Sequence, residues 1–413
     1  MHVVAPISLN SFRHLLFSTL FQHNLRRPKY MYMYSLYLIY PQVICYVNNY
    51  SHIQVYAAEI SSPEFRGIFG SFTQLFLSAG LMVIYFLGSL NGFQYYHASL
   101  VLIGLIAIFE LGGLFICDTP RWLLAHGRRQ EAISALKRLR GKDFDIGPEL
   151  STMELDLTQS PHLKKSKVLN HFKERDVFIP LTIMLFIMFF QQIGGLNAST
   201  AYSGLIFKEA GIKNYRATAT YAVGGTGVVF TLISLFIVDL FGRKSLLITS
   251  GMGMLLGTVM LGTHFFITRP SLCSSHENSS LLMSELLQSD SSADELCNPR
   301  FAPLAIVSLI LFNAAFSIGW GPVPWILLGE LIPLRVRGVG SGIATLVNWA
   351  TAAIVTGFYL DYAHKVKPWF AWWTFSILNL TAVLFVMFFV FETKGKKLEE
   401  IHDRYKKKQN HSC

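Results

Sequence analysis

Long apolar runs separated by polar segments dominate this chain. Eight runs are long enough to cross a bilayer as helices, and their apolar positions are continuous rather than alternating. Continuous runs exclude the alternating strands of a membrane β-barrel. The pattern therefore predicts an all-α, multi-pass membrane protein. The runs lie at about 67–90, 97–117, 177–207, 218–240, 245–267, 303–329, 338–361 and 369–391.

Composition agrees with this class, because 52% of the residues are hydrophobic and only 15% are charged. The net charge of +10 does not indicate a nucleic-acid partner, since most Lys and Arg residues lie between the apolar runs. By the positive-inside rule the basic segments 118–176, 243–244, 335–337 and 394–408 are cytoplasmic. The segment 268–302 then lies on the opposite, external side. The protein is expected in the plasma membrane or in an endosomal or lysosomal membrane.

The external segment carries candidates for covalent modification. Asn278 begins an Asn-Ser-Ser glycosylation sequon, and Cys273 and Cys297 are placed to pair in an oxidising compartment. The chain has no Walker loop, no metal-spaced His/Cys set and no nucleophile elbow. We therefore expect no metal, no cofactor and no enzyme activity.

A polar pattern occurs twice and indicates an internal repeat. An acidic residue is followed by six residues and Arg-Gly, and two apolar runs later by an acidic residue and Thr. Two copies of one membrane unit are typical of transporters built from two halves. The first half is predicted to lack about three helices, since fewer runs precede its copy. The copies are Glu59, Arg66-Gly67 and Asp118-Thr119, and Glu330, Arg337-Gly338 and Glu392-Thr393.

The same pattern predicts a division of the chain. The N-terminal segment reads as a truncated or alternative start, or as an incomplete gene model. Within the linker, 128–140 has helical spacing with Ala132, Leu136 and Leu139 on one face and is expected to be a surface helix. Residues 143–170 are expected to be a mobile linker between the halves. The segments are 1–51 (atypical N-terminus), 52–117 (partial N-terminal bundle), 118–176 (cytoplasmic linker with surface helices), 177–391 (C-terminal six-helix bundle) and 392–413 (cytoplasmic tail).

Amides within the apolar runs are candidates for a binding site. Gln191, Gln192 and Asn197 flank the pair Gly194-Gly195. An amide in hydrocarbon needs a partner or water. Paired glycines weaken a helix, as expected where a transporter helix breaks near its binding site. Because amides both donate and accept, they suit a neutral solute rich in hydroxyl groups. Helix packing is the alternative.

A second interruption lies in the sixth run, where GWGPVPW occupies residues 319–325. Such breaks are tolerated only against protein or a wet cavity. Trp325 could stack on the apolar face of a sugar ring, or it could fill the core beside a kink. Asn348-Trp349 repeats the pairing of an amide with an aromatic ring, and Gln74 is a further amide balanced between packing and site.

Charges of both signs gather at the cytoplasmic ends of the later runs. They predict an ion-pair cluster that holds one conformation and breaks in another, unless they are solvated charges that only fix topology. Glu110, inside the second run, is a candidate proton site, or its side chain reaches the interface. The clustered residues are Asp239, Arg243, Glu330, Arg337 and Glu392.

Six segments resemble the signatures of sugar porters of the major facilitator superfamily, nearest to the class III animal facilitative hexose transporters. The resemblance covers about residues 52–405 and implies a fold of two six-helix halves, here lacking about three N-terminal helices. It implies alternating-access transport of a hexose-like sugar down its gradient. The segments are DTPRWLL, QQIGGLN, DLFGRK, GWGPVPW, ELIPLRVRG and FETKGKKLEEI.

The resemblance also implies roles for individual residues. Sugar hydroxyls would be held by Gln74, Gln191, Gln192, Asn197 and Asn348, with Trp325 and Trp349 lining the cavity. The cytoplasmic charge network would comprise Glu59, Arg66, Asp118, Arg121, Asp239, Arg243, Glu330, Arg337 and Glu392. The chain departs from some members at Gly227, where they carry an amide near the sugar.

Two other functions stay open at this point. A proton-coupled symporter is one, although the proton-binding acid of the coupled relatives lies in a first helix with no counterpart here. A non-transporting truncated isoform or sugar-binding regulatory membrane protein is the other.

Overall fold

The computed structural model describes residues 66–89, 118–141, 144–159, 174–210, 214–268, 301–333 and 336–396, with a few single positions besides. Throughout these ranges the regular structure is helical, with no strand. Seven helical stretches within them are long and apolar enough to cross a membrane. This confirms the predicted all-α, multi-pass membrane protein, while the predicted run 97–117 lies outside the described residues.

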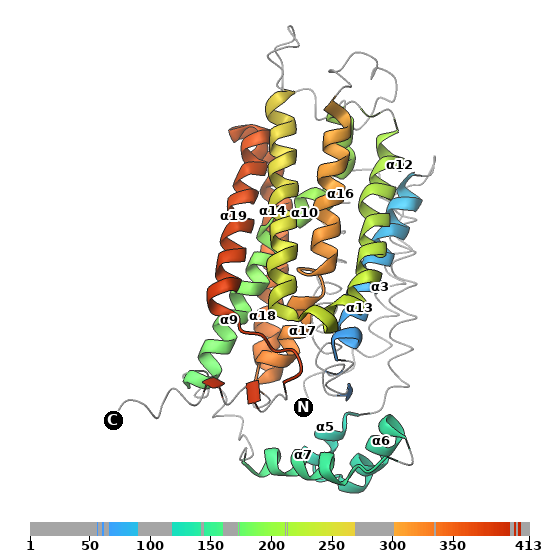
Figure 1. Ribbon diagram of the computed structural model, residues 1–413, viewed down its shortest axis with the longest axis vertical. Coiled ribbons are helices and arrows are strands. Elements are labelled where there is room, and N and C mark those ends of the chain that lie inside the picture. Colours follow the sequence, from blue (N-terminus) through green and yellow to red (C-terminus); the bar gives the residue numbers. More distant parts are fainter. Residues whose placement is uncertain are drawn as a thin grey trace, which may run out of the picture. The chain divides into compact units, whose positions relative to one another are not determined.

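The helices that could span a membrane follow the predicted runs, and two of them are broken (Figure 1). A helix break separates α9 from α10, another separates α16 from α17, and a π-helical turn precedes α13. The elements are α3 (Arg66–Ser89), α9 (Arg175–Ile193), α10 (Leu196–Ala201), α11 (Ser203–Glu209), α12 (Tyr215–Ala219), the π-helical turn Thr220–Gly225, α13 (Thr226–Phe241), α14 (Arg243–Ile267), α16 (Ala302–Ile318), α17 (Val323–Leu331), α18 (Arg337–Val366) and α19 (Pro368–Phe389).

The helix α14 packs closely against both α16 and α19, beside which it runs in Figure 1. Its glycines make this approach possible. A methyl group added at Gly257 would lie 2.9–3.0 Å from the Cβ, Cα and backbone N of Phe312, and one at Gly262 would lie 2.3 Å from the Trp373 ring. Small residues that let helix backbones approach are typical of membrane helix interfaces.

The helix α3 precedes the linker helices in sequence and packs along α13. A methyl group at Gly67 would lie 2.2 Å from a carboxylate oxygen of Asp239. Further along, the hydroxyls of Ser78 and Thr231 lie 3.3 Å apart, and Tyr85 donates to the carbonyl of Thr200 beyond α9. Contacts therefore join α3 to the later helices along its length.

The segment 118–159 forms three shorter helices, α5 (Pro120–Ala125), α6 (Arg129–Arg140) and α7 (Gly147–Gln159). Thr119 caps α5 by accepting from the backbone N–H of Trp122 at 3.2 Å. The helix predicted over 128–140 is confirmed by α6, in which Ala132 and Leu136 are buried and Leu139 is 41% exposed. Within 143–170, predicted as a linker between the halves, Gly147–Gln159 forms α7, and Arg140 joins α6 to it by an ion pair with Glu149 at 2.8 Å.

Replacing Gly257 by alanine is expected to lower the free energy of unfolding by about 1–3 kcal/mol, because the methyl group must displace the backbone of Phe312. Gly357→Ala on α18 is the matched control, since a methyl group there meets no described atom within 4 Å. Thermal unfolding of both variants in detergent makes the comparison. Equal transition temperatures would contradict this description of the α14–α16 interface.

Candidate functional site

The break between α9 and α10 lies at the two adjacent glycines. Gly195 has a φ of 99°, in the left-handed region that favours glycine. A methyl group on Gly195 would also lie 2.9 Å from the ring of Phe375 on α19. The carbonyl of Gly194 accepts a hydrogen bond from Asn379 Nδ2 at 3.1 Å. The predicted weak point of this helix is therefore a break supported by α19.

The break between α16 and α17 is fastened to α14 by Trp320. Its backbone N–H donates to Ser250 Oγ at 3.1 Å, and its indole Nε1–H donates to the carbonyl of Leu247 at 3.0 Å. Only 1% of Trp320 is exposed. The helix break leaves the carbonyls of Trp320 and Gly321 without the intrahelical donors that a continuous helix would give them.

Side-chain amides from three helical segments form one chain of hydrogen bonds that ends on this break. Asn197 on α10 donates to Gln192 Oε1 at 2.6 Å, and Gln192 Nε2 donates to Asn348 Oδ1 on α18 at 2.8 Å. Asn348 Nδ2 then donates to Gln191 Oε1 at 2.6 Å. Gln191 Nε2 donates to the carbonyls of Trp320 at 2.8 Å and Gly321 at 3.1 Å. We call Gln191, Gln192, Asn197 and Asn348 the amide chain.

The two ends of the amide chain differ in their remaining bonding capacity. Gln191 and Asn348 each donate twice and accept once, Asn348 giving its second bond to the carbonyl of Met188 at 3.1 Å. Gln192 and Asn197 each donate once to a described residue. Since an amide nitrogen carries two N–H groups, Gln192 and Asn197 keep a donor and acceptor positions for a further partner.

Three more residues predicted for the sugar site lie on α3, α17 and α18. Gln74 on α3 is buried, and its Cδ lies 3.3 Å from where a methyl group on Gly321 would be. Trp325 is buried in α17, and Trp349 is half-buried next to Asn348. Gly227, where some family members carry an amide, faces Ser78 of α3.

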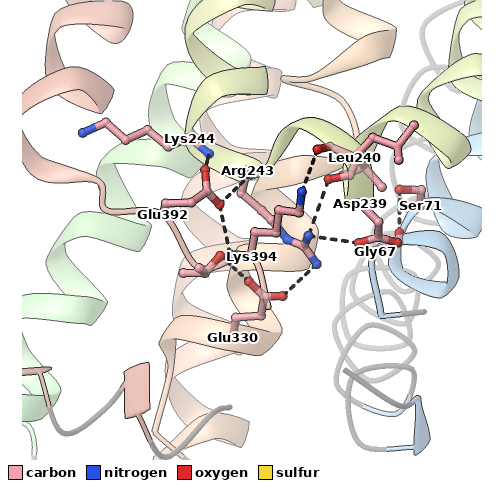
Figure 2. Close-up of polar contacts among 11 residues, drawn as sticks. Gly67, Ser71, Asp239, Leu240, Arg243, Lys244, Glu330, Glu392 and Lys394 are labelled. Atoms are coloured by element: carbon pink, nitrogen blue, oxygen red, sulfur yellow. Dashed lines mark hydrogen bonds and ion pairs between the residues drawn. The ribbon is translucent and has the colours of Figure 1, made fainter. Parts of the chain in front are cut away.

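Arg243, at the start of α14, lies between two carboxylates (Figure 2). Its guanidinium is 2.9 Å from Asp239 at the end of α13 and 3.3 Å from Glu330 on α17. The side chains of Arg243 and Glu330 are only 3% and 2% exposed. Thr393 completes the arrangement by donating its hydroxyl to the second oxygen of Glu330 at 2.7 Å. Arg243 and Glu330 are therefore removed from water together, while the Asp239 side chain stays 21% exposed.

Glu392, which follows α19, holds the N-terminus of α14. Its carboxylate accepts from the backbone N–H groups of Arg243 at 2.9 Å and Lys244 at 3.0 Å. A carboxylate here satisfies free helix donors and complements the helix dipole. The preceding Gly242 has a φ of 87°, and a methyl group on it would lie 2.5 Å from the carboxylate. The FGRK turn thus needs glycine on both grounds.

The other residues predicted for the charge network lie elsewhere or are not described. Arg337 is buried and donates from Nε to the carbonyl of Ile332 at 3.3 Å. Asp118 lies 3.8 Å from Arg128 in an exposed ion pair, and Arg121 is half-buried in α5. Glu59 and the side chain of Arg66 lie outside the described residues. So do the candidate proton site Glu110 and the candidates for modification, Cys273, Asn278 and Cys297.

Replacing Arg243 by methionine is expected to lower the free energy of unfolding by about 3–5 kcal/mol, because it leaves the buried Glu330 carboxylate without its cation. Lys244→Met is the matched control, since the Lys244 ammonium contacts only a backbone carbonyl, that of Met387, among its described bonds. Thermal unfolding of purified protein measures both effects. A loss in Lys244→Met as large as that in Arg243→Met would contradict the assignment.

Comparison with known proteins gives this arrangement a context. A family model described as "Sugar (and other) transporter" matches residues 48–405. The facilitated glucose transporter member 8 of solute carrier family 2 from Bos taurus is 35% identical over 84% of this chain and 69% of its own length. The facilitated trehalose transporter Tret1 from Apis mellifera ligustica is 31% identical over 86% of this chain.

A solved structure of the proton:xylose symporter XylE, of the major facilitator superfamily, superposes with a TM-score of 0.66 at 25% identity. The superposition covers 85% of this chain and 70% of XylE. The chain spans 65% of the length of the bee relative, about two thirds of a curated family member. On the family model and these relatives, this chain belongs to the sugar transporter family of the major facilitator superfamily, whose members are membrane transporters and not enzymes.

Proposed function

We propose that this chain carries a neutral, hexose-like sugar across its membrane by facilitative alternating access, with the amide chain as the binding site. The observation that carries the proposal is the unused hydrogen-bonding capacity of Gln192 and Asn197, which lie on either side of the break between α9 and α10. A sugar presents several hydroxyls that donate and accept, and so matches amides that do both.

The same geometry gives the remaining amides a supporting role. Both N–H groups of Gln191 and of Asn348 are used by protein partners, so these two amides fix where Gln192 and Asn197 point. A bound sugar would exchange its bonds to water for bonds to these amides, each worth about 0.5–1.5 kcal/mol net. Such modest bonds suit a carrier, which must release its cargo as readily as it binds it.

The buried ion pairs of Arg243 supply a physical basis for alternation. In this structure α13, α14 and α17 are joined through Arg243, and Glu392 adds the segment after α19. A path opening between these helices would have to separate those groups, so the cluster favours the conformation that is closed at this end. Sugar binding would bias the equilibrium only by its difference in affinity for the two conformations.

The contacts of the described acidic residues favour facilitative transport over proton coupling. The buried Glu330 is already engaged by Arg243 and Thr393, at the charged end rather than beside the amide chain. The two curated relatives are named facilitated transporters. The solved relative is named a proton:xylose symporter, and this makes proton coupling the second candidate.

Uptake of radiolabelled hexose in transporter-deficient yeast tests the proposal. The wild-type chain is expected to support uptake, and Gln192→Leu is expected to reduce it at least about tenfold, because two hydrogen bonds to hydroxyls are lost. Gln130→Leu, which changes an exposed amide on α6, is the matched control at equal membrane abundance.

Hexose binding without uptake would contradict transport and favour the regulatory, sugar-binding alternative. Neither binding nor uptake, by folded protein in the membrane, would contradict the sugar site itself. Equal loss in Gln192→Leu and Gln130→Leu would show that the amide chain is not where the sugar binds.

A facilitative carrier is expected to show the same initial uptake rate at external pH 5.5 and 7.5, and in the presence or absence of a protonophore. The reason is that no proton moves with the sugar. Stimulation by external acid that the protonophore abolishes would contradict uniport. If stimulation is seen, Glu110→Gln tests whether that acid carries the proton.

A further inference from the structure

We infer that Asn379 on α19 is a positioning residue for sugar binding, because it fixes the α9–α10 break and with it the separation of Gln192 from Asn197. This inference rests on the proposed function. Asn379 is 2% exposed and lies against the break itself, where its Nδ2 donates to the carbonyl of Gly194 at 3.1 Å.

The Asn379 side chain occupies the space that a side chain at position 194 would need. A methyl group on Gly194 would lie 2.5 Å from Asn379 Oδ1, and the next obstacle, Met254 Cε, is at an ordinary 3.5 Å. Gly194 itself has φ −66° and ψ −1°, a conformation that alanine adopts freely. A side chain at position 194 would therefore have to displace the Asn379 amide from its bond to the Gly194 carbonyl, whereas the backbone of Gly194 does not itself require glycine.

Phe375, one turn before Asn379, makes a second contact of this kind. Its ring fills the space beside Gly195, but Gly195 also has the left-handed φ of 99°. Ser376, between the two, donates to Thr258 on α14 at 3.0 Å and so ties this turn of α19 to the bundle. Asn379 and Phe375 together form a fixed socket for the two glycines.

The socket matters because α10 is short. It spans Leu196–Ala201, a six-residue helix that cannot hold its own position through intrahelical bonds. The carbonyl of Gly194 lies where α9 has ended, and a carbonyl left without a donor in a membrane is strongly unfavourable. If Asn379 is removed, the segment is expected to shift until this carbonyl finds another donor. Asn197, three residues later, would shift with it and lose its 2.6 Å bond geometry to Gln192.

A double-mutant cycle on purified chain in lipid nanodiscs tests this inference, with the dissociation constant of radiolabelled D-glucose as the readout. Gly194→Ala is expected to weaken binding at least tenfold, and Asn379→Ala about fivefold. The double variant is expected to bind as well as Asn379→Ala alone, since the new methyl group enters the space left by the amide. Additive losses in the double variant would overturn the inference.

The matched control repeats the cycle at the neighbouring glycine. Gly195→Ala is expected to stay defective in combination with Phe375→Ala, because the left-handed backbone persists when the ring is gone. Rescue at both positions would overturn the inference, since it would show that any loosening of the socket restores binding. In transport, Asn379→Ala is expected to raise KM about fivefold while kcat changes by less than twofold.

Hydrogen exchange of the amides of residues 196–201 gives a readout that needs no sugar. Asn379→Ala is expected to speed their exchange at least tenfold, while the exchange of the α14 amides stays unchanged. Unchanged exchange would overturn the inference. If the wild-type chain binds no sugar, the proposed function fails while hydrogen exchange still decides whether Asn379 positions α10.

Discussion

A helix that stops inside a bilayer leaves carbonyl and N–H groups that hydrocarbon cannot satisfy. This chain stops two helices there, at Gly194-Gly195 and at 319–322, and the arrangement around the amide chain meets that requirement. Asn379 satisfies Gly194, and Gln191 satisfies Trp320 and Gly321. The groups that repair the two breaks are thus partly the groups assigned to bind sugar, which couples the stability of the fold to the shape of the site.

A second requirement operates at the charged end, where Arg243 and Glu330 are both removed from water. Buried charges are tolerated only when paired and hydrogen-bonded, and removing one partner leaves a large penalty. The arrangement brings together α13, α14, α17 and the segment after α19. Loss of one ion pair leaves the remaining buried charge without a partner, and on this basis we propose that this end opens as a unit.

Much of this was predictable from periodicity and polarity alone. Apolar runs located the described membrane helices, and two glycines beside Gln191 and Gln192 located a break. A cluster of Asp239, Arg243, Glu330, Arg337 and Glu392 was predicted from charges that share one depth. The structure places Asp239, Glu330 and Glu392 in contact with Arg243, whereas the Nε of Arg337 donates to the carbonyl of Ile332. Their roles in transport remain proposals.

The remaining features depend on contacts that local sequence patterns do not specify. Gln191 reaches the carbonyl of Trp320, 129 positions along the chain, and no local pattern specifies that pairing. Asn379 is a lone amide in an apolar run, so only its contact with Gly194 distinguishes it from a packing residue. Thr393 was marked in the sequence only by the repeated acidic-Thr pair, and that pattern did not predict its hydrogen bond to Glu330. Helical spacing placed Leu139 on the face of Ala132 and Leu136, but spacing alone does not show that Leu139 is left 41% exposed.

The central claim is that sugar binds on the amide chain, and equilibrium binding to purified protein tests it most directly. Radiolabelled D-glucose would be titrated against the wild-type chain and Asn348→Leu in lipid nanodiscs, with L-glucose as competitor. We predict saturable binding that L-glucose does not displace and that Asn348→Leu abolishes, because Gln191 and Gln192 lose their shared partner. Binding of equal strength in both proteins would contradict the account.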